Sequence, residues 1–305
     1  MQVLEGHRGV VFSAEFALGG QLLFTGDASG TVIAWRAPSW QRHCAIAHKP
    51  ETPIYCIAAG PGDVHFGRGT TVKQWAIGPE FLADFSSLKS FTLGDAHDKE
   101  VVPVVRTAKE LITSGYDGQL MFWDVETGQA RGGALHDRVM ALAVTDGARY
   151  DAEAGGLLAC GHEDGSLTMF DLAAYRPLGT IAHAHERDVY ALSFQNVVFQ
   201  RKLHVASISP ADRVVRVWDG KRQVVELEGA GFTVAFRPDG RWLAHGHGND
   251  IVIRDGATWE VVQTLRGHTG PISALAWSPI ASLDDPWSGC LASGAHDGTV
   301  RVWPL

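Results

Sequence analysis

The sequence predicts an all-β protein made of seven similar units, and a recurring hairpin pattern is the first reason. The pattern is clearest in LASGAHDGTVRVW (291–303), where two apolar segments flank Asp297-Gly298. Glycine tolerates the positive φ of a tight reversal, so this dipeptide between two strands is a strong hairpin signal. The pattern recurs along the whole chain, which indicates a repeat architecture.

The spacing of the copies is the second reason. Each copy closes at a position that is aromatic in six units and arginine in one: Trp35, Trp75, Trp123, Phe170, Trp218, Arg254 and Trp303. Consecutive closing positions are 36 to 49 residues apart, a period that accommodates four short strands per unit. Length alone would favour two domains, but the uniform repeat without a linker predicts one domain over residues 1–305.

Composition and charge exclude several classes of protein. The 26 lysines and arginines are scattered and the formal net charge is −8, so a nucleic-acid footprint is absent. The first nine residues lack the basic-then-apolar pattern of a signal peptide, so none is expected, and no apolar stretch approaches the roughly eighteen residues of a membrane span. The four cysteines are widely spaced without C-x-x-C, which is typical of reduced thiols. We therefore expect a cytoplasmic protein, or a nuclear one in a eukaryote, that contacts neither nucleic acid nor membrane directly.

The order of residues within a unit carries a family resemblance. In the last unit, Gly267-His268 comes first, a small-Ser-Gly strand and Asp297-Gly298 follow, and Trp303 closes the unit. This order resembles the tryptophan–aspartate (WD) repeat of β-propellers, and the resemblance covers nearly the whole chain without identifying a single protein. It implies a seven-bladed β-propeller of four-stranded antiparallel blades. It also implies that residues 2–4 supply the outer strand of the last blade, so that the N-terminal strand closes the ring.

The resemblance further implies a hydrogen-bonded tetrad of His, Ser or Thr, Asp and Trp within a blade. Two blades match at every position: His97, Thr113, Asp117 and Trp123 in blade 3, and His268, Ser293, Asp297 and Trp303 in blade 7. A buried carboxylate and imidazole are costly unless each finds a partner, so we interpret these tetrads as structural rather than catalytic.

Other blades depart from the tetrad pattern. Blade 5 has Ile208 where Ser is expected, blade 1 has Ser29 in place of Asp, and blade 4 keeps only His136 and Asp164. Blades 2 and 6 lack the set. The long link over residues 76–96, which includes Phe81, is expected to cap the side of the propeller; a docking patch is the alternative.

Metal sites, cofactors and enzymatic activity are not expected. His183 and His185, and His245 and His247, are His-x-His pairs that could chelate zinc or copper, but no third ligand of suitable spacing accompanies them. The phosphate-binding, zinc-protease and nucleophile-elbow motifs are absent. A propeller-type hydrolase or small-ligand-binding protein acting at the central channel remains the alternative function.

The resemblance implies a non-catalytic scaffold or adaptor, monomeric as a propeller and a subunit of a larger complex, that binds protein or peptide partners on one face. In this family the turns before the third strands commonly meet partners, and the candidate residues there are Arg68, Tyr116, Glu163, His247 and His296. Tyr and Arg are enriched at interface hot spots. Glu163 and the net charge favour a basic partner. Each of these residues could equally be a solvated turn residue.

Overall fold

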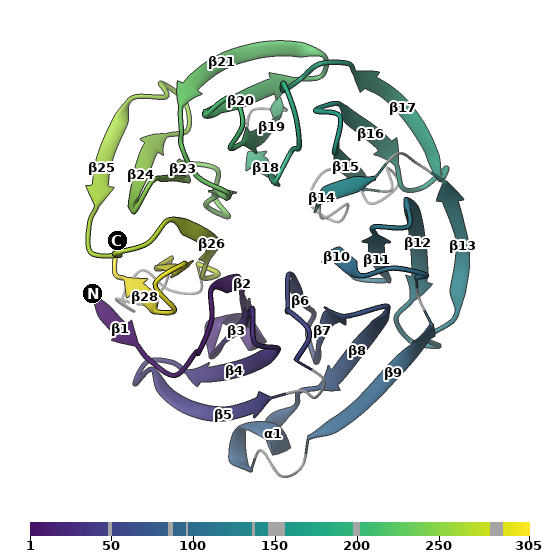
Figure 1. Cartoon of the computed structure of the whole chain (residues 1–305), viewed down its shortest axis with the longest axis vertical. Helices are drawn as coiled ribbons and strands as arrows, with labels where there is room; N and C mark the ends of the chain where they lie inside the picture. Colours follow the sequence, from purple (N-terminus) through teal and green to yellow (C-terminus); the bar gives the residue numbers. More distant parts are fainter. Residues whose placement is uncertain are drawn as a thin grey trace. The chain divides into compact units, whose positions relative to one another are not determined.

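The computed structural model describes residues 1–47, 51–84, 88–95, 97–135, 138–145, 156–197, 202–280 and 289–305. These residues form seven four-stranded sheets whose neighbouring strands follow one another in the sequence, with one exception at the N-terminus (Figure 1). The predicted fold class, a seven-bladed β-propeller of four-stranded antiparallel blades, is confirmed. The chain divides into two compact units, Met1–Leu135 with Ser273–Leu305, and His136–Ile272.

The first unit holds blades 1, 2, 3 and 7. Blade 1 consists of β2 (Val11–Ala17), β3 (Leu22–Asp27), β4 (Thr31–Arg36) and β5 (Gln41–Ala47). Blade 2 consists of β6 (Ile57–Ala59), β7 (Asp63–Arg68), β8 (Thr71–Ala76) and β9 (Lys89–Asp95). Blade 3 consists of β10 (Val101–Arg106), β11 (Glu110–Gly115), β12 (Gln119–Asp124) and β13 (Ala130–Leu135). Blade 7 consists of β26 (Ile272–Trp277), β27 (Leu291–Ala295), β28 (Val300–Trp303) and β1 (Gln2–Leu4). Two short helices, η1 (Leu18–Gly20) and α1 (Pro79–Ala83), connect strands.

The second unit holds blades 4, 5 and 6. Blade 4 consists of β14 (Val139–Val144), β15 (Leu157–His162), β16 (Leu167–Asp171) and β17 (Arg176–Ile181). Blade 5 consists of β18 (Ala191–Val197), β19 (Lys202–Ser209), β20 (Val214–Asp219) and β21 (Arg222–Glu228). Blade 6 consists of β22 (Val234–Phe236), β23 (Trp242–His247), β24 (Asp250–Asp255) and β25 (Val261–Leu265).

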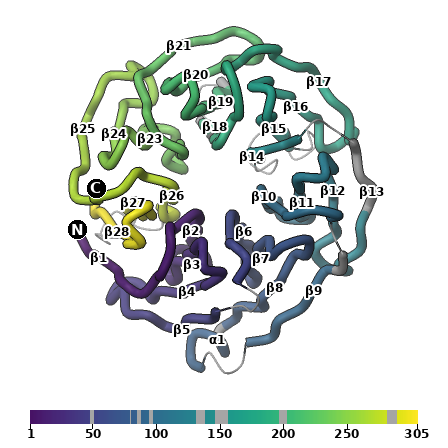
Figure 2. Tube along the Cα trace, in the orientation of Figure 1, coloured from purple at the N-terminus to yellow at the C-terminus, as the bar shows by residue number. Residues whose placement is uncertain are grey.

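The exception in strand order is β1, which completes blade 7 as predicted. It pairs antiparallel with β28, Gln2 opposite Val302 and Leu4 opposite Val300, and both chain ends lie at this blade (Figure 2). Leu4 is buried in the core of this blade, whereas Gln2 and Val3 are exposed. The strand therefore covers the edge of β28 and adds one apolar side chain to the core.

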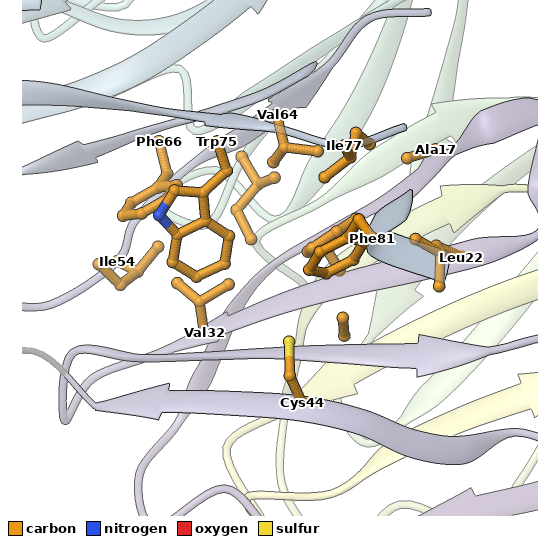
Figure 3. Close-up of a cluster of buried hydrophobic side chains, with 13 residues drawn as sticks. Ala17, Leu22, Val32, Cys44, Ile54, Val64, Phe66, Trp75, Ile77 and Phe81 are labelled. Atoms are coloured by element: carbon orange, nitrogen blue, oxygen red, sulfur yellow. The ribbon is translucent and has the colours of Figure 1, made fainter. Parts of the chain in front are cut away.

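The largest fully buried side chains of the first unit pack in one cluster formed by blades 1 and 2 and α1 (Figure 3). The rings of Phe66 and Trp75 meet edge to face at 4.8 Å, and Phe24 lies 6.4 Å from Trp75. Phe81 on α1 stacks on Phe24 at 6.3 Å and is 1% exposed. Capping by the 76–96 link is thereby confirmed for Phe81, since a docking patch would leave this ring accessible.

The pairing of β1 predicts that this strand stabilises the chain. Deleting residues 1–5 removes the edge partner of β28 and the buried Leu4, so the melting temperature should fall by on the order of 5 °C and aggregation should increase. Circular dichroism melts and light scattering measure both effects. In the full chain, Leu4→Asp should lower the melting temperature much more than Val3→Asp, because only Leu4 is buried. Equal effects of the two substitutions would contradict the observed orientation of β1.

Candidate partner-binding site

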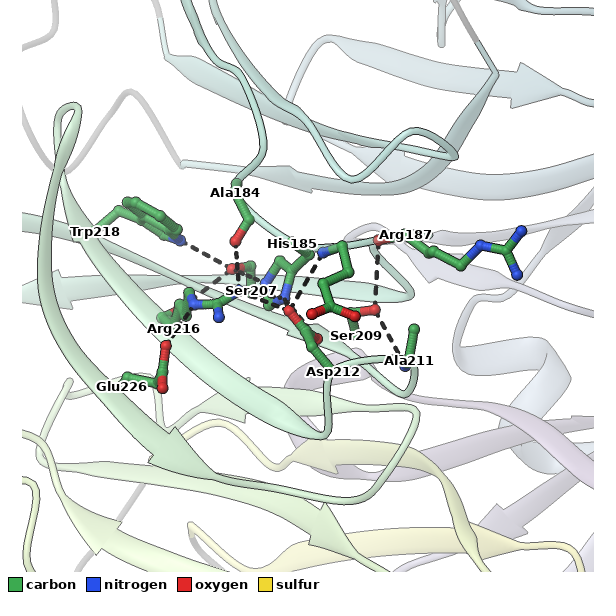
Figure 4. Close-up of polar contacts among 11 residues, drawn as sticks. Ala184, His185, Arg187, Ser207, Ser209, Ala211, Asp212, Arg216, Trp218 and Glu226 are labelled. Atoms are coloured by element: carbon green, nitrogen blue, oxygen red, sulfur yellow. Dashed lines mark hydrogen bonds and ion pairs between the residues drawn. The ribbon is translucent and has the colours of Figure 1, made fainter.

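Blade 5 contains a complete hydrogen-bonded tetrad (Figure 4). His185 Nδ1 lies 3.0 Å from Asp212 Oδ2, and His185 Nε2 lies 2.8 Å from Ser207 Oγ. The indole N–H of Trp218 donates to the same Ser207 Oγ at 2.9 Å. The expectation that Ile208 takes the serine position is wrong by one residue: Val205 is opposite Trp218, which places Ser207 rather than Ile208 under the indole.

The imidazole of His185 is neutral, so each hydrogen bond of the tetrad has a defined donor and acceptor. Burial lowers the pKa of His185, against the opposing charge of Asp212. A neutral imidazole that donates from Nδ1 to the carboxylate accepts at Nε2 from the Ser207 hydroxyl. Arg216 adds a second donor to Asp212 at 2.6 Å and joins it to Glu226 at 2.8 Å. Burial would raise the pKa of Asp212, but His185 and Arg216 hold it below its usual range.

Blade 3 repeats this geometry. His97 Nδ1 lies 3.0 Å from Asp117 Oδ1, and its Nε2 lies 2.9 Å from Thr113 Oγ1. Trp123 donates to Thr113 at 3.0 Å. Asp117 also accepts the backbone N–H groups of Asp98 and Gln119. The carboxylate thus holds both the segment before the first strand and the turn before the third.

Blade 1 has the same arrangement with a different carboxylate. His7 Nε2 lies 2.7 Å from Thr25 Oγ1, and Trp35 donates to Thr25 at 2.9 Å. His7 Nδ1 lies 3.1 Å from Asp27, at the end of β3. The interpretation that Ser29 replaces the carboxylate is therefore wrong: Asp27 supplies it, and Ser29 donates its hydroxyl to Asp27 at 2.7 Å.

Blade 7 joins its serine and tryptophan in the same way. Trp303 donates to Ser293 at 2.9 Å. Asp297 accepts the backbone N–H and the hydroxyl of Thr299 at 2.9 and 2.7 Å. His268 is buried.

Blade 4 departs from the pattern. His136 lies outside the described residues. His162 Nε2 lies 3.0 Å from Thr168 Oγ1, and Asp164 accepts the N–H of Ser166 at 2.9 Å. Cys160 is fully buried.

In blades 2 and 6 the pair formed by the buried hydroxyl and the tryptophan indole is replaced by a different pair of side chains. In blade 2, Phe66 occupies the hydroxyl position and packs against Trp75. In blade 6, His245 and Arg254 occupy the positions of the hydroxyl residue and the tryptophan, and Arg254 Nε donates to His245 Nε2 at 3.2 Å. Burial lowers the pKa of His245 to about 4, so the ring is neutral and can accept this bond.

The Ser207–His185–Asp212 chain has the connectivity of a hydrolytic triad, but its hydroxyl is not accessible. Ser207 is 0% exposed, and its oxygen already accepts the indole N–H of Trp218. A nucleophile must reach the substrate, so this arrangement stabilises the blade instead.

Glu15 on β2 was not singled out by the sequence. Desolvation raises its pKa to about 8, so the carboxyl is mostly protonated at neutral pH. Hydrolysis needs a second group in reach of the same substrate, and no described residue forms a hydrogen bond or ion pair with the carboxyl group of Glu15. Across the described part of the chain, no three His, Cys, Asp or Glu side chains gather to hold a metal, and no helix is long and apolar enough to span a bilayer.

The candidate partner-binding residues of the first unit lie where the second strand of a blade ends. Arg68 ends β7, Tyr116 follows β11 and His296 follows β27. Arg68 and Tyr116 are half-buried, and His296 is exposed. The Tyr116 N–H donates to the backbone oxygen of Glu100 at 3.0 Å, which fixes the tyrosine beside the segment that enters blade 3.

Sequence reasoning missed an aromatic pair beside these turns. The rings of Phe12 and Tyr55 lie 5.3 Å apart. Burial raises the pKa of Tyr55, and the charge of Glu100 raises it further. Glu100 therefore interacts with both tyrosines: its charge acts on the Tyr55 hydroxyl, and its backbone oxygen accepts the N–H of Tyr116. We define Phe12, Tyr55, Glu100 and Tyr116 as the aromatic patch.

The second unit has corresponding features. Glu163, which follows β15, is exposed and pairs with Arg138 at 3.0 Å, while His247 ends β23 and is half-buried. Tyr190 and Phe232, just before β18 and β22, meet edge to face at 5.5 Å, and Tyr190 is 43% exposed. In four blades an aromatic residue lies at or just before the start of the first strand: Phe12, Tyr55, Tyr190 and Phe232. This recurrence is the sequence signal that could have revealed the Phe12–Tyr55 and Tyr190–Phe232 pairs.

The shared acceptor in blade 5 predicts a large stability effect at Ser207. Ser207→Ala leaves His185 and Trp218 without their common partner and should lower the free energy of unfolding by about 1–3 kcal/mol. Ser209→Ala is the matched control, because Ser209 is equally buried on the same strand but makes only long bonds of 3.3 and 3.4 Å. Urea unfolding of both variants measures the difference. A Ser209→Ala loss as large as that of Ser207→Ala would contradict the tetrad's role.

A buried imidazole in blade 2 predicts acid sensitivity. His65 is 0% exposed, neither ring nitrogen forms a hydrogen bond with a described residue, and burial lowers its pKa to about 4. Below about pH 6.5 the unfolded chain binds a proton that the folded chain does not, so the free energy of unfolding falls as the pH falls toward 4. His65→Leu should reduce the loss of stability between pH 7 and pH 5 in urea unfolding, whereas His296→Gln, at an exposed position, should not. An unchanged loss in His65→Leu would exclude His65 as the cause.

Comparison with known proteins supports the WD-repeat resemblance. A model of the family "WD domain, G-beta repeat" matches residues 1–36 and 259–304. The WD repeat-containing protein 26 homolog of Arabidopsis thaliana is 20% identical over 100% of this chain and 50% of that protein. Protein transport protein sec13 of Aspergillus clavatus is 24% identical over 63% of this chain and 59% of that protein.

Eukaryotic translation initiation factor 3 subunit I of Coccidioides immitis is 24% identical over 98% of this chain and 93% of that protein. The chain spans about half the length of the first of these relatives and 59% of the second. With the seven four-stranded blades, these matches show that the chain is similar to the WD-repeat β-propeller proteins.

Proposed function

We propose that the protein is a non-catalytic scaffold or adaptor that binds protein or peptide partners at the turns between the second and third strands, as a subunit of a larger complex. The aromatic patch of the first unit carries this proposal. Its two tyrosines, Tyr55 and Tyr116, each combine an apolar ring with a polar tip, a profile that is enriched at interface hot spots. One relative is by name a subunit of a translation initiation factor, which supports the role in a complex.

The backbone around the patch supports a preformed surface. Val101 N–H donates to Gly69 O at 2.8 Å, which ties blade 3 to blade 2, and Tyr116 N–H donates to Glu100 O at 3.0 Å within blade 3. Gly67 lets blade 3 approach closely, since a Cβ there would lie 2.9 Å from Val101. A surface held this firmly loses little conformational entropy when it binds.

Charge favours a basic partner. The chain has a net charge of −8, Glu100 precedes the first strand of blade 3 and Glu163 lies at the β15–β16 turn, although Arg138 neutralises part of the charge of Glu163. Complementary charge speeds and orients encounter. The proposal places a monomeric propeller in the cytoplasm, or in the nucleus of a eukaryote, with no direct contact to nucleic acid.

Removing the two tyrosines of the aromatic patch tests the proposal. Tyr55→Ala with Tyr116→Ala should reduce capture of the principal partner by about tenfold or more, as expected for loss of two hot-spot side chains. Quantitative mass spectrometry of tagged protein purified from its own cells measures capture, and circular dichroism checks that the fold is kept.

Tyr175→Ala is the control for this test, because Tyr175 is 47% exposed but precedes β17 at a different kind of turn. Glu163→Lys should also weaken capture if the partner is basic. Full capture by the double variant, or loss of capture in Tyr175→Ala, would show that the partner binds elsewhere.

A further inference from the structure

We propose that a groove between blades 5 and 6 binds an acidic peptide segment that carries one large apolar side chain. The groove is lined by the β20–β21, β22–β23 and β24–β25 turns. These turns lie at the opposite end of blades 5 and 6 from the turns that join second and third strands. The groove is therefore separate from the surface proposed above. Its volume of about 630 Å³ lies within the range of ligand pockets.

The floor of the groove is preformed by one buried amide. Gln195 is 4% exposed, and its Nε2 donates to Gly240 O at 2.7 Å and to Gly256 O at 2.9 Å. Its Oε1 lies 2.6 Å from His204 Nδ1. A Cβ at Gly256 would lie 2.3 Å from Gly240 O, so glycine is required for this close approach. The two blades are thus fixed relative to each other at the groove before any ligand arrives.

Three arginines give the groove its donors. Arg237 lies over the ring of Trp242 at 4.6 Å and its Nε is 3.8 Å from Asp239. Arg222 is 77% exposed and only 3.9 Å from Asp219. Arg241 is exposed and makes no ion pair with a described residue. A guanidinium has five N–H donors, so Arg222 and Arg241 retain most of theirs for a ligand.

Two of the three carboxylates of the groove, those of Asp239 and Asp255, are already engaged. Asp255 accepts the N–H groups of Ala257 and Thr258 at 2.9 and 2.8 Å, and these bonds hold its pKa below the usual range. Asp239 accepts the N–H of Arg241 at 3.0 Å. Three aspartates balance three arginines in formal charge, but the remaining hydrogen-bonding capacity is mostly that of donors. A ligand rich in carboxylates complements it.

The apolar part of the groove fits an aliphatic side chain of a peptide. Trp259 rests against Phe236 at 6.4 Å and His204 at 5.8 Å, so its ring is held in place beside Val224. Arg237 covers one face of the Trp242 ring, so a planar ligand group could stack only on the other face of this indole. An aliphatic side chain against Trp259, flanked by carboxylates near Arg222 and Arg241, satisfies both parts of the groove.

Fluorescence anisotropy with the full chain tests the proposal. The probe is a fluorescein-labelled peptide Asp-Glu-Leu-Asp-Ser-Glu, with two companions: one in which Leu is replaced by Ser, and one in which the acids are replaced by their amides. We expect both companions to bind about tenfold more weakly than the probe, because each lacks one half of the complementarity.

Charge reversal of the free arginines supplies the matched variants. Arg222→Glu with Arg241→Glu should weaken binding of the probe by about tenfold or more, whereas Arg266→Glu should change it by less than about twofold. Arg266 is a suitable control because it is 76% exposed in the same unit and does not line the groove. The Tyr55→Ala, Tyr116→Ala variant should bind the probe like the wild type, so failure of this proposal is distinguishable from failure of the proposed function.

Three results would overturn the proposal. These are equal binding of the probe and its amide companion, wild-type affinity in the double arginine variant, and displacement of the probe by ATP or inorganic phosphate at concentrations where the unlabelled peptide does not compete. The last result would assign the groove to phosphate ligands instead.

Discussion

A buried hydroxyl on the second strand of a blade is the interaction on which the blades most depend. In four blades it accepts the indole N–H of the tryptophan that closes the third strand, at 2.9 Å in blades 1, 5 and 7 and 3.0 Å in blade 3. In blades 1, 3 and 5 it also meets the imidazole of the histidine that precedes the blade. One oxygen therefore joins the second strand, the third strand and the incoming segment. Because the site is buried, removing the hydroxyl, the indole or the imidazole leaves a polar group of the others unpaired, and this lowers the stability of the blade.

The hairpin repeat and the period predicted seven β units of four short strands, because alternation and turn residues are local properties, and the WD-repeat resemblance supplied the propeller arrangement. The tetrads show where this reasoning ends. In blade 5 the turn is one residue longer than in blade 3: Ser207 is opposite Arg216, whereas Thr113 is opposite Met121. Counting back from Asp212 therefore reaches Ile208. Strand register places the hydroxyl, and turn length places the carboxylate, so a fixed spacing in the sequence cannot locate both.

The candidate surface was predictable only in part for a related reason. Turn residues such as Tyr116 can be identified from the sequence, because the turn residues Asp117-Gly118 that follow it mark the turn. The partnership of Phe12 with Tyr55, or of Tyr190 with Phe232, joins neighbouring blades across about forty residues, and it depends on how the first strands lie side by side. Similarly, Asp27 was overlooked in blade 1 because it ends a strand instead of occupying the tip of the turn.

Blade 6 shows what the chain does without the tryptophan. Arg254 takes the indole's position, donates from Nε to His245, and donates from Nη1 to the backbone oxygen of Trp259 at 3.0 Å. The second bond has no counterpart in an indole, which carries a single N–H donor. It holds the residue whose ring forms the apolar wall of the groove, while the backbone N–H of Trp259 is held by Asp255 O at 2.9 Å. The exchange of tryptophan for arginine thus keeps the second and third strands joined and also fixes the β24–β25 turn, which explains how the blade with the most altered interior has a well-defined groove at its edge.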